Sequence, residues 1–429
     1  MDDVFAPARI LLPGPGVDLE KWACLACDQF TSQPDYWQAA DAFVGGAPST
    51  LRIILPEVFL GKNDTQRICS IHAAMADYRA HVLTQAVEGY VYVERTTASG
   101  VRPGLLGAVD LDAYSYAPGA PCAVRPSEAT VPARIPPRLA VRRGAVLESP
   151  HVLLLADDRT NRLLGHFRAA KHRLTPLYDT PLMLGGGRAA AWAVTDGADI
   201  AFVRDTLAAL GGQDAFDQRY PAAAGRPPFT LAVGDGNHSL ATAKAAWEEL
   251  KAGLPPALAA AHPARRCLAE VVSLACPAIA MEGIHRIVKG AVFAEFFRGF
   301  RVFLAARGAF PAVPGQAGAL GCTLLAPEGD RLPLAWTGGP WPLAVGAVEA
   351  YLAEWLPAHP GHSVDYIHGA EDLAALCAAG GTGILLDAPA RDALLTDVAL
   401  GGVLPKKSFS MGAAREKRYY LECRALTEE

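Results

Sequence analysis

The residues best suited to binding or catalysis stand together in Gly-Asp-Gly-Asn-His at positions 234–238, directly after the apolar run 229–233. A helical pattern begins at once and places Leu240 and Trp247 on one stripe. The N-terminus of a helix presents unpaired N–H groups and the positive end of its dipole, which attract phosphate or carboxylate. The pattern therefore predicts an anion site where a strand passes into a helix.

Each residue of this loop has a candidate role. Gly234 and Gly236 allow the backbone to approach a ligand closely. Asp235 can hold Mg²⁺ or accept a proton, and His238 can contact an anion or move a proton. The alternative is a tight turn in which Asp235 or Asn237 only caps the helix. One capping residue is enough for that purpose, whereas this loop supplies four special groups.

A second group of charges lies upstream. Arg138 and Arg142 are one turn apart on a helix expected from Pro137 to about residue 147, so they share one face and can bind a phosphate or carboxylate together. Arg134 precedes this helix. The alternative is a solvated basic face whose charges form ordinary ion pairs.

The elements that must position these groups alternate along the chain. Strands are expected over 89–96, 104–114 and 151–157, and helices over 62–87 and after Gly236. The segment 308–336 is rich in glycine and proline and indicates hairpins or a linker to a second unit. Mixed strands and helices favour an α+β or mixed α/β fold.

Composition limits the class of protein. The chain has 429 residues, of which 51% are hydrophobic and 19% charged, which is typical of a globular protein with a large core. A net charge of −5 argues against a general nucleic-acid binder. No apolar window is long enough for a membrane span, and nine scattered cysteines favour reduced thiols, so we expect a cytoplasmic protein without nucleic-acid or membrane partners.

Other motifs carry less weight. Cys24 and Cys27 form a CxxC, but no second pair completes a zinc site, so inert thiols are favoured. The glycine clusters at 185–187 and 380–381 lack the Gly-Lys-Ser/Thr ending of a P-loop, and indicate turns and helix ends.

Several stretches, in order, resemble the bacterial and archaeal family known as domain of unknown function 1015. They are LEKWACLACDQFTSQPDYW, PSEATVPARIPPRL, the loop at 235–239, GIHRIVKG and LPKKSFSMG. Asp235, Gly236 and His238 match the family's Asp-Gly-His-His-Arg motif, whereas Asn237 and Ser239 differ from it. The arginine that is absent at Ser239 leaves part of a phosphate's charge to be neutralised by other residues.

This resemblance implies a ParB/sulfiredoxin-like core in which the loop binds nucleotide phosphates, over residues 1–290. A smaller C-terminal α/β unit over 291–429 would follow, with a tail that returns to the site. Glu128 matches a Glu-x-Thr segment of the family and can serve as a general base. Lys407 and Ser408 match its Pro-x-Lys-Ser pattern and can belong to an anion pocket, the alternative being a solvated basic turn.

The resemblance also implies a function. Some members of the wider superfamily phosphorylate free serine, which predicts a small-molecule phosphotransferase that uses ATP or ADP with Mg²⁺ and acts on serine or phosphoserine. Asp235, His238 and Glu128 would be its catalytic residues. One alternative is a nucleotide-binding switch that hydrolyses slowly or not at all. Another is a scaffold protein in which the loop is only a helix cap.

Overall fold

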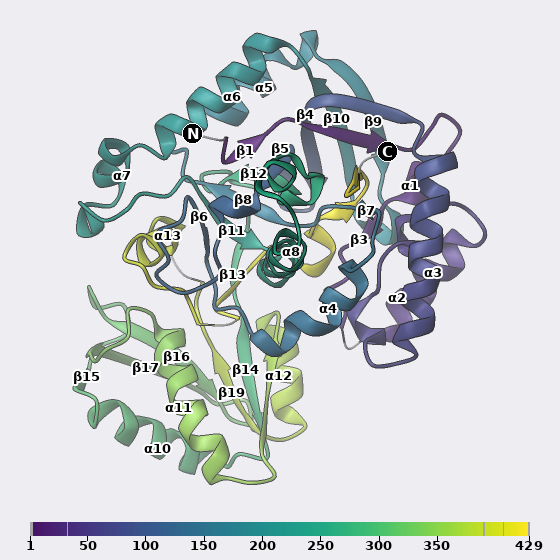
Figure 1. The fold of residues 1–429 in the computed structure, drawn as a ribbon. Coiled ribbons are helices and arrows are strands. Elements are labelled where there is room, and N and C mark those ends of the chain that lie inside the picture. The colour runs from purple at the N-terminus through teal and green to yellow at the C-terminus, as the bar shows by residue number, and fades with distance from the viewer. Residues whose placement is uncertain (1–2, 32, 389–390, 406, 428–429) are drawn as a thin grey trace. The chain divides into compact units, whose positions relative to one another are not determined.

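The computed structural model describes residues 3–31, 33–388, 391–405 and 407–427. The chain forms two compact units (Figure 1). Unit 1 comprises Met1–Ile279, Val398–Gly402 and Ala414–Glu429, and unit 2 comprises Ala280–Asp397 and Val403–Ala413. Helices and strands alternate in both, so the prediction of a mixed α/β fold is confirmed.

Unit 1 is built on a ten-stranded sheet with the order β6-β11-β8-β12-β5-β4-β10-β9, while β1 pairs with β5 and β2 with β4. Most pairs are antiparallel, but β11 runs parallel to β6, and β12 runs parallel to β8. The strands are β1 (Phe5–Ala6), β2 (Ala8–Leu12), β4 (Gln85–Thr97), β5 (Gly100–Asp110), β6 (Val124–Pro126), β8 (Leu153–Ala156), β9 (Thr175–Pro181), β10 (Arg188–Val194), β11 (Leu231–Asp235) and β12 (Arg266–Ser273).

Two hydrophobic clusters of unit 1 both include side chains from this sheet. Along β4, Val91 and Val93 belong to one cluster and Tyr90 and Tyr92 to the other, as the two-residue repeat of a strand requires. The α-helices of this unit are α1 (Leu19–Trp22), α2 (Pro34–Val44), α3 (Asp64–Asp77), α4 (Ile135–Arg142), α5 (Arg162–Ala170), α6 (Gly197–Leu210), α7 (Gln213–Arg219), α8 (Asn237–Lys251) and α9 (Pro256–Ala261).

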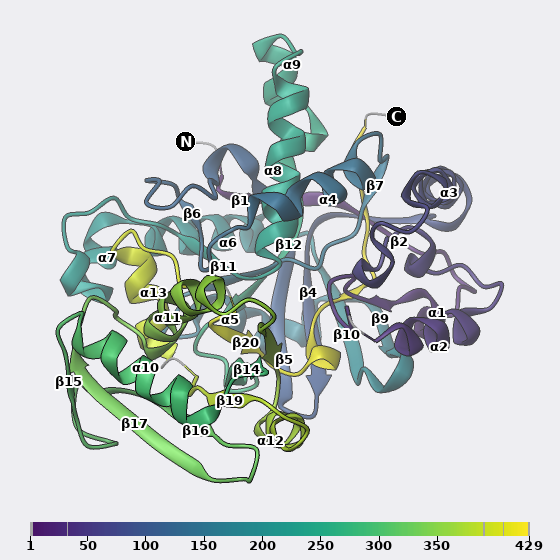
Figure 2. The ribbon, with the colours of Figure 1, turned by 90° about the horizontal axis from the view of Figure 1, so that it is seen from below.

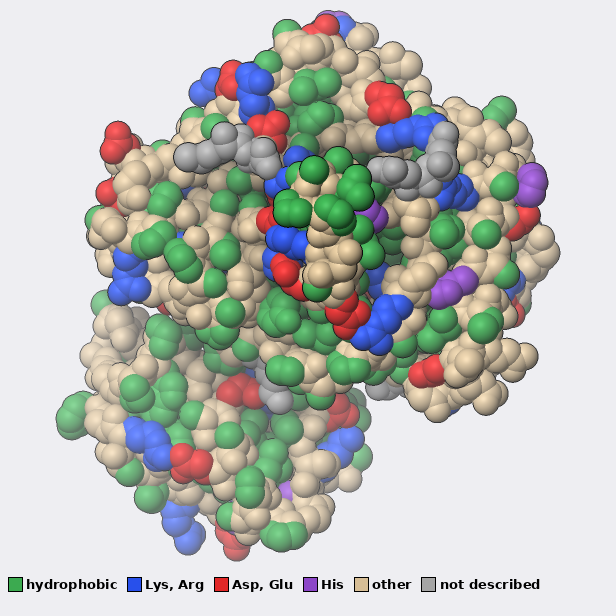
Figure 3. Space-filling model, in the orientation of Figure 1, with side chains coloured by type: hydrophobic (Ala, Val, Ile, Leu, Met, Phe, Trp, Pro, Cys, Tyr) green, Lys and Arg blue, Asp and Glu red, His purple; other side chains and the backbone are tan. Residues whose placement is uncertain are grey.

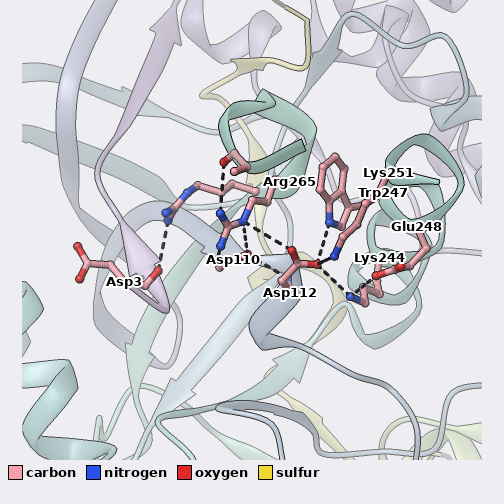
Figure 4. Close-up of polar contacts among 10 residues, drawn as sticks. Asp3, Asp110, Asp112, Lys244, Trp247, Glu248, Lys251 and Arg265 are labelled. Atoms are coloured by element: carbon pink, nitrogen blue, oxygen red, sulfur yellow. Dashed lines mark hydrogen bonds and ion pairs between the residues drawn. The ribbon is translucent and has the colours of Figure 1, made fainter. Parts of the chain in front are cut away.

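Helix α8 is fixed to the sheet by an apolar stripe and by a polar network. Leu240 and Trp247 are buried beneath it. The carboxylate of Asp112 accepts a hydrogen bond of 2.9 Å from the indole of Trp247 and one of 2.8 Å from the ammonium of Lys251 (Figure 4). Beside it, Arg265 pairs with Asp110 at 2.6 Å. The contacts of Asp112 hold the helix whose first turn contains Asn237 and His238.

The far end of the same helix projects from the sheet with α9 beyond it (Figure 2). Figure 3 shows hydrophobic side chains gathered over this outer end. Leu250 and Leu258 are exposed there, at 40% and 60%. The buried residues of α8 therefore extend from Asn237 as far as Trp247, and Leu250 beyond them is exposed.

The C-terminal segment of unit 1 returns to the N-terminal part of the chain. β21 (Tyr419–Tyr420) pairs with β3 (Cys24–Leu25), and β22 (Arg424–Ala425) pairs with β7 (Leu147–Glu148). The indole of Trp22 donates a hydrogen bond of 2.7 Å to the carbonyl of Leu421. These segments form part of the core of unit 1.

Unit 2 contains a six-stranded sheet with the order β15-β17-β16-β19-β14-β18 and a short ladder of β13 with β20. Phe296, Phe300 and Trp336 pack together in its core. Its elements are β13 (Met281–Gly283), β14 (His285–Lys289), α10 (Phe293–Ala305), β15 (Ala309–Pro311), β16 (Leu320–Leu325), β17 (Arg331–Gly338), α11 (Ala344–Ala358), β18 (Ser363–Ile367), α12 (Ala370–Ala378), β19 (Thr382–Leu385), α13 (Arg391–Ala399) and β20 (Phe409–Met411). In the described parts of the chain, every helix is too short or too polar to span a bilayer.

Candidate functional site

The turn between β11 and α8 is the centre of the candidate site. Strand β11 ends at Asp235, Gly236 is the N-cap with φ +82°, and α8 begins at Asn237. A β-carbon at Gly236 would lie 3.1 Å from Cα of Val152 and 3.3 Å from Cδ2 of His151. Glycine is therefore needed here both for its backbone conformation and for close packing.

A glycine cap leaves the first turn of α8 without a capping side chain. Asp235 lies in the strand and Asn237 is already helical, so neither occupies the capping position. The amides of the first helical turn have no acceptor within the helix. The turn therefore presents N–H groups and a positive dipole end, the arrangement that binds anions.

Asp235 faces a lysine from the C-terminal segment. Nζ of Lys417 lies 3.6 Å from Oδ1 of Asp235, and the lysine side chain is only 6% exposed. Oδ2 of Asp235 and Oδ1 of Asn237 are buried, and no hydrogen-bond donor among the described residues reaches them. Two buried oxygens at one turn thus lack a hydrogen-bond partner among the described residues.

His238 is held in one orientation by the backbone. Its Nε2 accepts a hydrogen bond of 3.1 Å from the N–H of Val131. The neutral imidazole therefore carries its proton on Nδ1, so Nδ1–H is the atom with which it can donate to an anion. The ring is half-buried.

The segment that carries Glu128 lies beside this turn because two parallel strands end together. In the β6–β11 ladder Val233 is opposite Pro126, so Ser127 and Glu128 follow one strand where Asp235 ends the other. The hydroxyls of Ser127 and Thr130 are buried, and no described residue provides them a hydrogen-bond partner. The strand register thus brings the segment of Glu128 beside the loop, and the role of Glu128 stays a prediction.

The predicted arginines of α4 face two separate carboxylates. Arg138 pairs with Glu57, and Arg142 pairs with Glu148 at 2.6 Å. Burial alone would lower the pKa of Arg142, but the charge of Glu148 outweighs it and raises the pKa. Arg134 is exposed at the start of the helix. A phosphate bound by both Arg138 and Arg142 would therefore compete with carboxylates already in place.

Sequence reasoning missed a buried polar group next to Gly236. The hydroxyl of Tyr420 lies 2.5 Å from Nδ1 of His151 and 3.2 Å from Sγ of Cys27. Nε2 of His151 lies 3.9 Å from Asp28. The signals for these residues were the CxxC that contains Cys27, for which an inert thiol was favoured, and the family stretch that contains Cys27 and Asp28.

Lys407 and Ser408 belong to unit 2. The carbonyl of Lys407 accepts a hydrogen bond of 2.9 Å from Arg286, and Arg286 also pairs with Glu349 at 3.0 Å. The hydroxyl of Ser408 is buried and donates to the carbonyl of Pro405 at 2.6 Å. Within its own unit, this loop is held by hydrogen bonds to neighbouring backbone groups.

A cavity of about 250 Å³ opens elsewhere in unit 1. Four arginines, Arg9, Arg79, Arg266 and Arg424, line it together with apolar residues, and none of the residues of the β11–α8 turn does. The turn is the candidate pursued because it combines uncapped amides, a carboxylate and a lysine, whereas the polar groups of this cavity are four arginines and a threonine, without a carboxylate.

A magnesium ion is compatible with the turn. No three His, Cys, Asp or Glu side chains gather at metal-binding distance in the described parts of the chain. Mg²⁺ is commonly held by one or two carboxylates together with substrate phosphates and water. The buried Oδ2 of Asp235 is a suitable ligand of that kind.

Comparison with known proteins defines the family. A family model described as "Protein of unknown function (DUF1015)" matches residues 11–331. The chain belongs to the DUF1015 family. No protein with a curated description matches this DUF1015 chain.

Solved structures resemble this DUF1015 protein only distantly. A free serine kinase in complex with AMP has 11% identity and a TM-score of 0.39, and the match covers 73% of this chain and 90% of that one. A C-terminally truncated SbnI from Staphylococcus aureus has 10% identity and a TM-score of 0.38, with 74% and 85% covered. A conserved hypothetical protein from Pyrococcus furiosus has 13% identity and a TM-score of 0.36, with 75% and 94% covered. Likeness at this level says nothing of function.

Proposed function

We propose that this protein is a small-molecule phosphotransferase that binds a nucleotide, with Mg²⁺, at the turn between β11 and α8. The observation that supports the proposal is the uncapped first turn of α8, preceded by Gly236 at φ +82° and flanked by Asp235 and Lys417. A helix N-terminus with a close glycine backbone is a recurrent phosphate site. The AMP and ADP named for the distant structural neighbours agree with such a ligand, but the proposal rests on the turn.

The residues of the turn would divide the work. The amides of the first turn and Nδ1–H of His238 donate to phosphate oxygens, and Lys417 neutralises part of their charge. Asp235 would hold Mg²⁺, which when bound would neutralise phosphate charge. Lys417 would supply the charge that the family's arginine provides at the position of Ser239.

Glu128 is the proposed general base. Its segment leaves β6 beside Asp235, and the backbone of Val131 in that segment touches His238. A carboxylate at this place can accept the proton of an acceptor hydroxyl as the phosphoryl group is transferred to it. Free serine is the acceptor we propose to test first, because some members of the wider superfamily phosphorylate it.

Two measurements test the proposal. Isothermal titration with ATP, ADP and CTP, with and without Mg²⁺, should detect nucleotide binding to the wild-type protein. Phosphorus NMR with ATP, Mg²⁺ and serine should then detect a new phosphomonoester signal. His238→Ala should lower turnover, with His172→Ala, on a separate 3-10 turn of unit 1, as control. Absence of nucleotide binding would contradict the proposal and leave the scaffold interpretation.

A nucleotide-binding switch is the second candidate, and one observation favours it. Arg138 and Arg142 pair with Glu57 and Glu148, which leaves fewer cations to stabilise charge in a transition state. A protein of this kind would bind nucleotide without phosphorylating serine. Tight binding combined with an unchanged phosphorus spectrum would identify it.

A further inference from the structure

Two arginines of unit 1 face each other across neighbouring strands. Arg95 of β4 is directly opposite Arg102 of β5 in an antiparallel ladder. They are 3% and 4% exposed. Like charges directly opposite in a ladder destabilise it, and burial adds to that effect. Burial and the neighbouring charge of Arg102 lower the pKa of Arg95 to about 10. An arrangement of this kind calls for an explanation.

The hydrogen bonds of the two arginines all reach backbone carbonyls, and most of these belong to the C-terminal segment. Arg95 donates to the carbonyl of Lys417 at 3.2 Å and to that of Arg415 at 3.1 Å. Arg102 donates to the carbonyl of Glu416 at 3.1 Å. Three consecutive carbonyls are therefore held by one pair of guanidinium groups.

Further contacts fix the same segment through Glu416 and Tyr419. The backbone N–H of Ser99, in the β4–β5 turn, donates to the carboxylate of Glu416 at 3.1 Å, and its hydroxyl donates at 2.9 Å. The guanidinium of Arg95 also stacks 4.7 Å from the ring of Tyr419. The end of the β4–β5 hairpin thus binds residues 415–419 through the buried Arg95 and Arg102 and through the exposed Ser99. We call this set of contacts the grip.

Lys417 connects these hydrogen bonds with the β11–α8 turn. Its carbonyl is bound by Arg95, and its ammonium lies 3.6 Å from Asp235 at the β11–α8 turn. We propose that Arg95 and Arg102 are positioning residues of the anion site, which act by holding the C-terminal segment so that the charge of Lys417 reaches the turn. The inference rests on the proposed function, because that proposal makes the turn an anion site. The contacts of Arg95 and Arg102 with the C-terminal segment do not depend on that proposal.

A double-mutant cycle tests this inference. Arg102→Gln removes the charge and keeps a donor, and Lys417→Met removes the ammonium. We expect Arg102→Gln to weaken ATP binding in isothermal titration by about tenfold, as Lys417→Met does, and to have no further effect when the two are combined. Arg188→Gln is the matched control, because it alters an exposed arginine on the adjacent strand β10, paired with Asp179.

The outcomes separate the alternatives. Unchanged affinity in folded Arg102→Gln, or effects that add in the double variant, would overturn the inference, because Arg102 would then act apart from Lys417. Arg102→Lys keeps the buried charge but lacks the guanidinium fork, and takes the place of Arg102→Gln if that variant does not fold.

A second readout keeps the inference testable if the wild-type protein binds no nucleotide. In that case the proposed function fails, and hydrogen exchange of residues 414–420 decides the matter. Faster exchange there in Arg102→Gln than in Arg188→Gln supports the grip, and equal exchange overturns it.

Discussion

Lys417 and Asp235 lie at distant points of the sequence, yet the ammonium of one is 3.6 Å from the carboxylate of the other. Because the lysine side chain is 6% exposed and the aspartate 18%, water screens this pair only weakly. The contact brings a cation to the N-terminus of α8, where Ser239 stands in place of the family's arginine. It also makes the C-terminal segment part of the candidate site.

Lys417→Met should therefore weaken nucleotide binding. Loss of a hydrogen bond from a charged donor corresponds to about 1.5–3 kcal/mol, or roughly tenfold or more in affinity. Isothermal titration with ATP measures the change, and Lys289→Met, which alters an exposed ion pair with Asp365 in unit 2, is the control. Equal affinities for the two variants would exclude Lys417 from the site.

Gly236→Ala should destabilise the protein more than a comparable substitution elsewhere. Gly236 and Gly225 both have positive φ, at +82° and +78°, but a β-carbon at Gly225 meets nothing within 4 Å. Alanine should cost about 1–2 kcal/mol at either position for its backbone conformation, and about 1–3 kcal/mol more at Gly236 for overpacking. Urea denaturation of both variants measures the difference. If the two lose equal stability, the close approach of His151 and Val152 has no energetic consequence.

The strand, turn and helix around the Asp-Gly-Asn-His loop could be predicted from the sequence because the pattern that specifies them is local. A strand, a glycine and a helix follow one another at 231–251, as the residue types predict, whereas the anion site at their turn stays a prediction. The predicted helix over 62–87 was too long, since α3 ends at Asp77, a π-helical turn ends at Val82 and β4 begins at Gln85. The helix at Pro137 also ends early, at Arg142.

What the sequence left hidden depends on long-range contacts. Nothing near Lys417 indicates that its side chain meets Asp235, because the tail is placed by carbonyls bound to Arg95 and Arg102. The regular spacing of Arg138 and Arg142 predicted joint binding of a phosphate, but the positions of Glu57 and Glu148 are fixed by tertiary packing. Helical spacing shows which residues share a face, not what that face meets.

The stability of unit 1 should depend on Glu148 in acid. Burial alone would raise the pKa of Glu148, but Arg424 and Arg142 outweigh it and hold the pKa below its ordinary value of 4.5. The folded state then binds fewer protons than the unfolded state. The ion pairs of Glu148 with Arg424 and Arg142 therefore stabilise the fold above about pH 4.5, and this stability is lost as pH falls through the lowered pKa.

Glu148→Gln should therefore flatten the dependence of the free energy of unfolding on pH between about pH 5 and 3. Urea denaturation at a series of pH values measures it. Glu249→Gln, which breaks an exposed pair with Arg143, should flatten it much less. Parallel curves for wild type and Glu148→Gln would refute the role of Glu148.

The thiol of Cys27 should be inert in the folded protein although it belongs to a CxxC. Burial, together with the charges of Asp28 and Glu57, raises its pKa to about 12. Since the thiolate is the reactive form, iodoacetamide at pH 8 should modify the exposed Cys69 and leave Cys27 unmodified until urea is added. Peptide mass spectrometry reads both sites in one sample, so Cys69 is an internal control for reagent activity. Modification of Cys27 as fast as that of Cys69 under native conditions would mean that the polar group around Tyr420 and His151 is open to solvent and reagents.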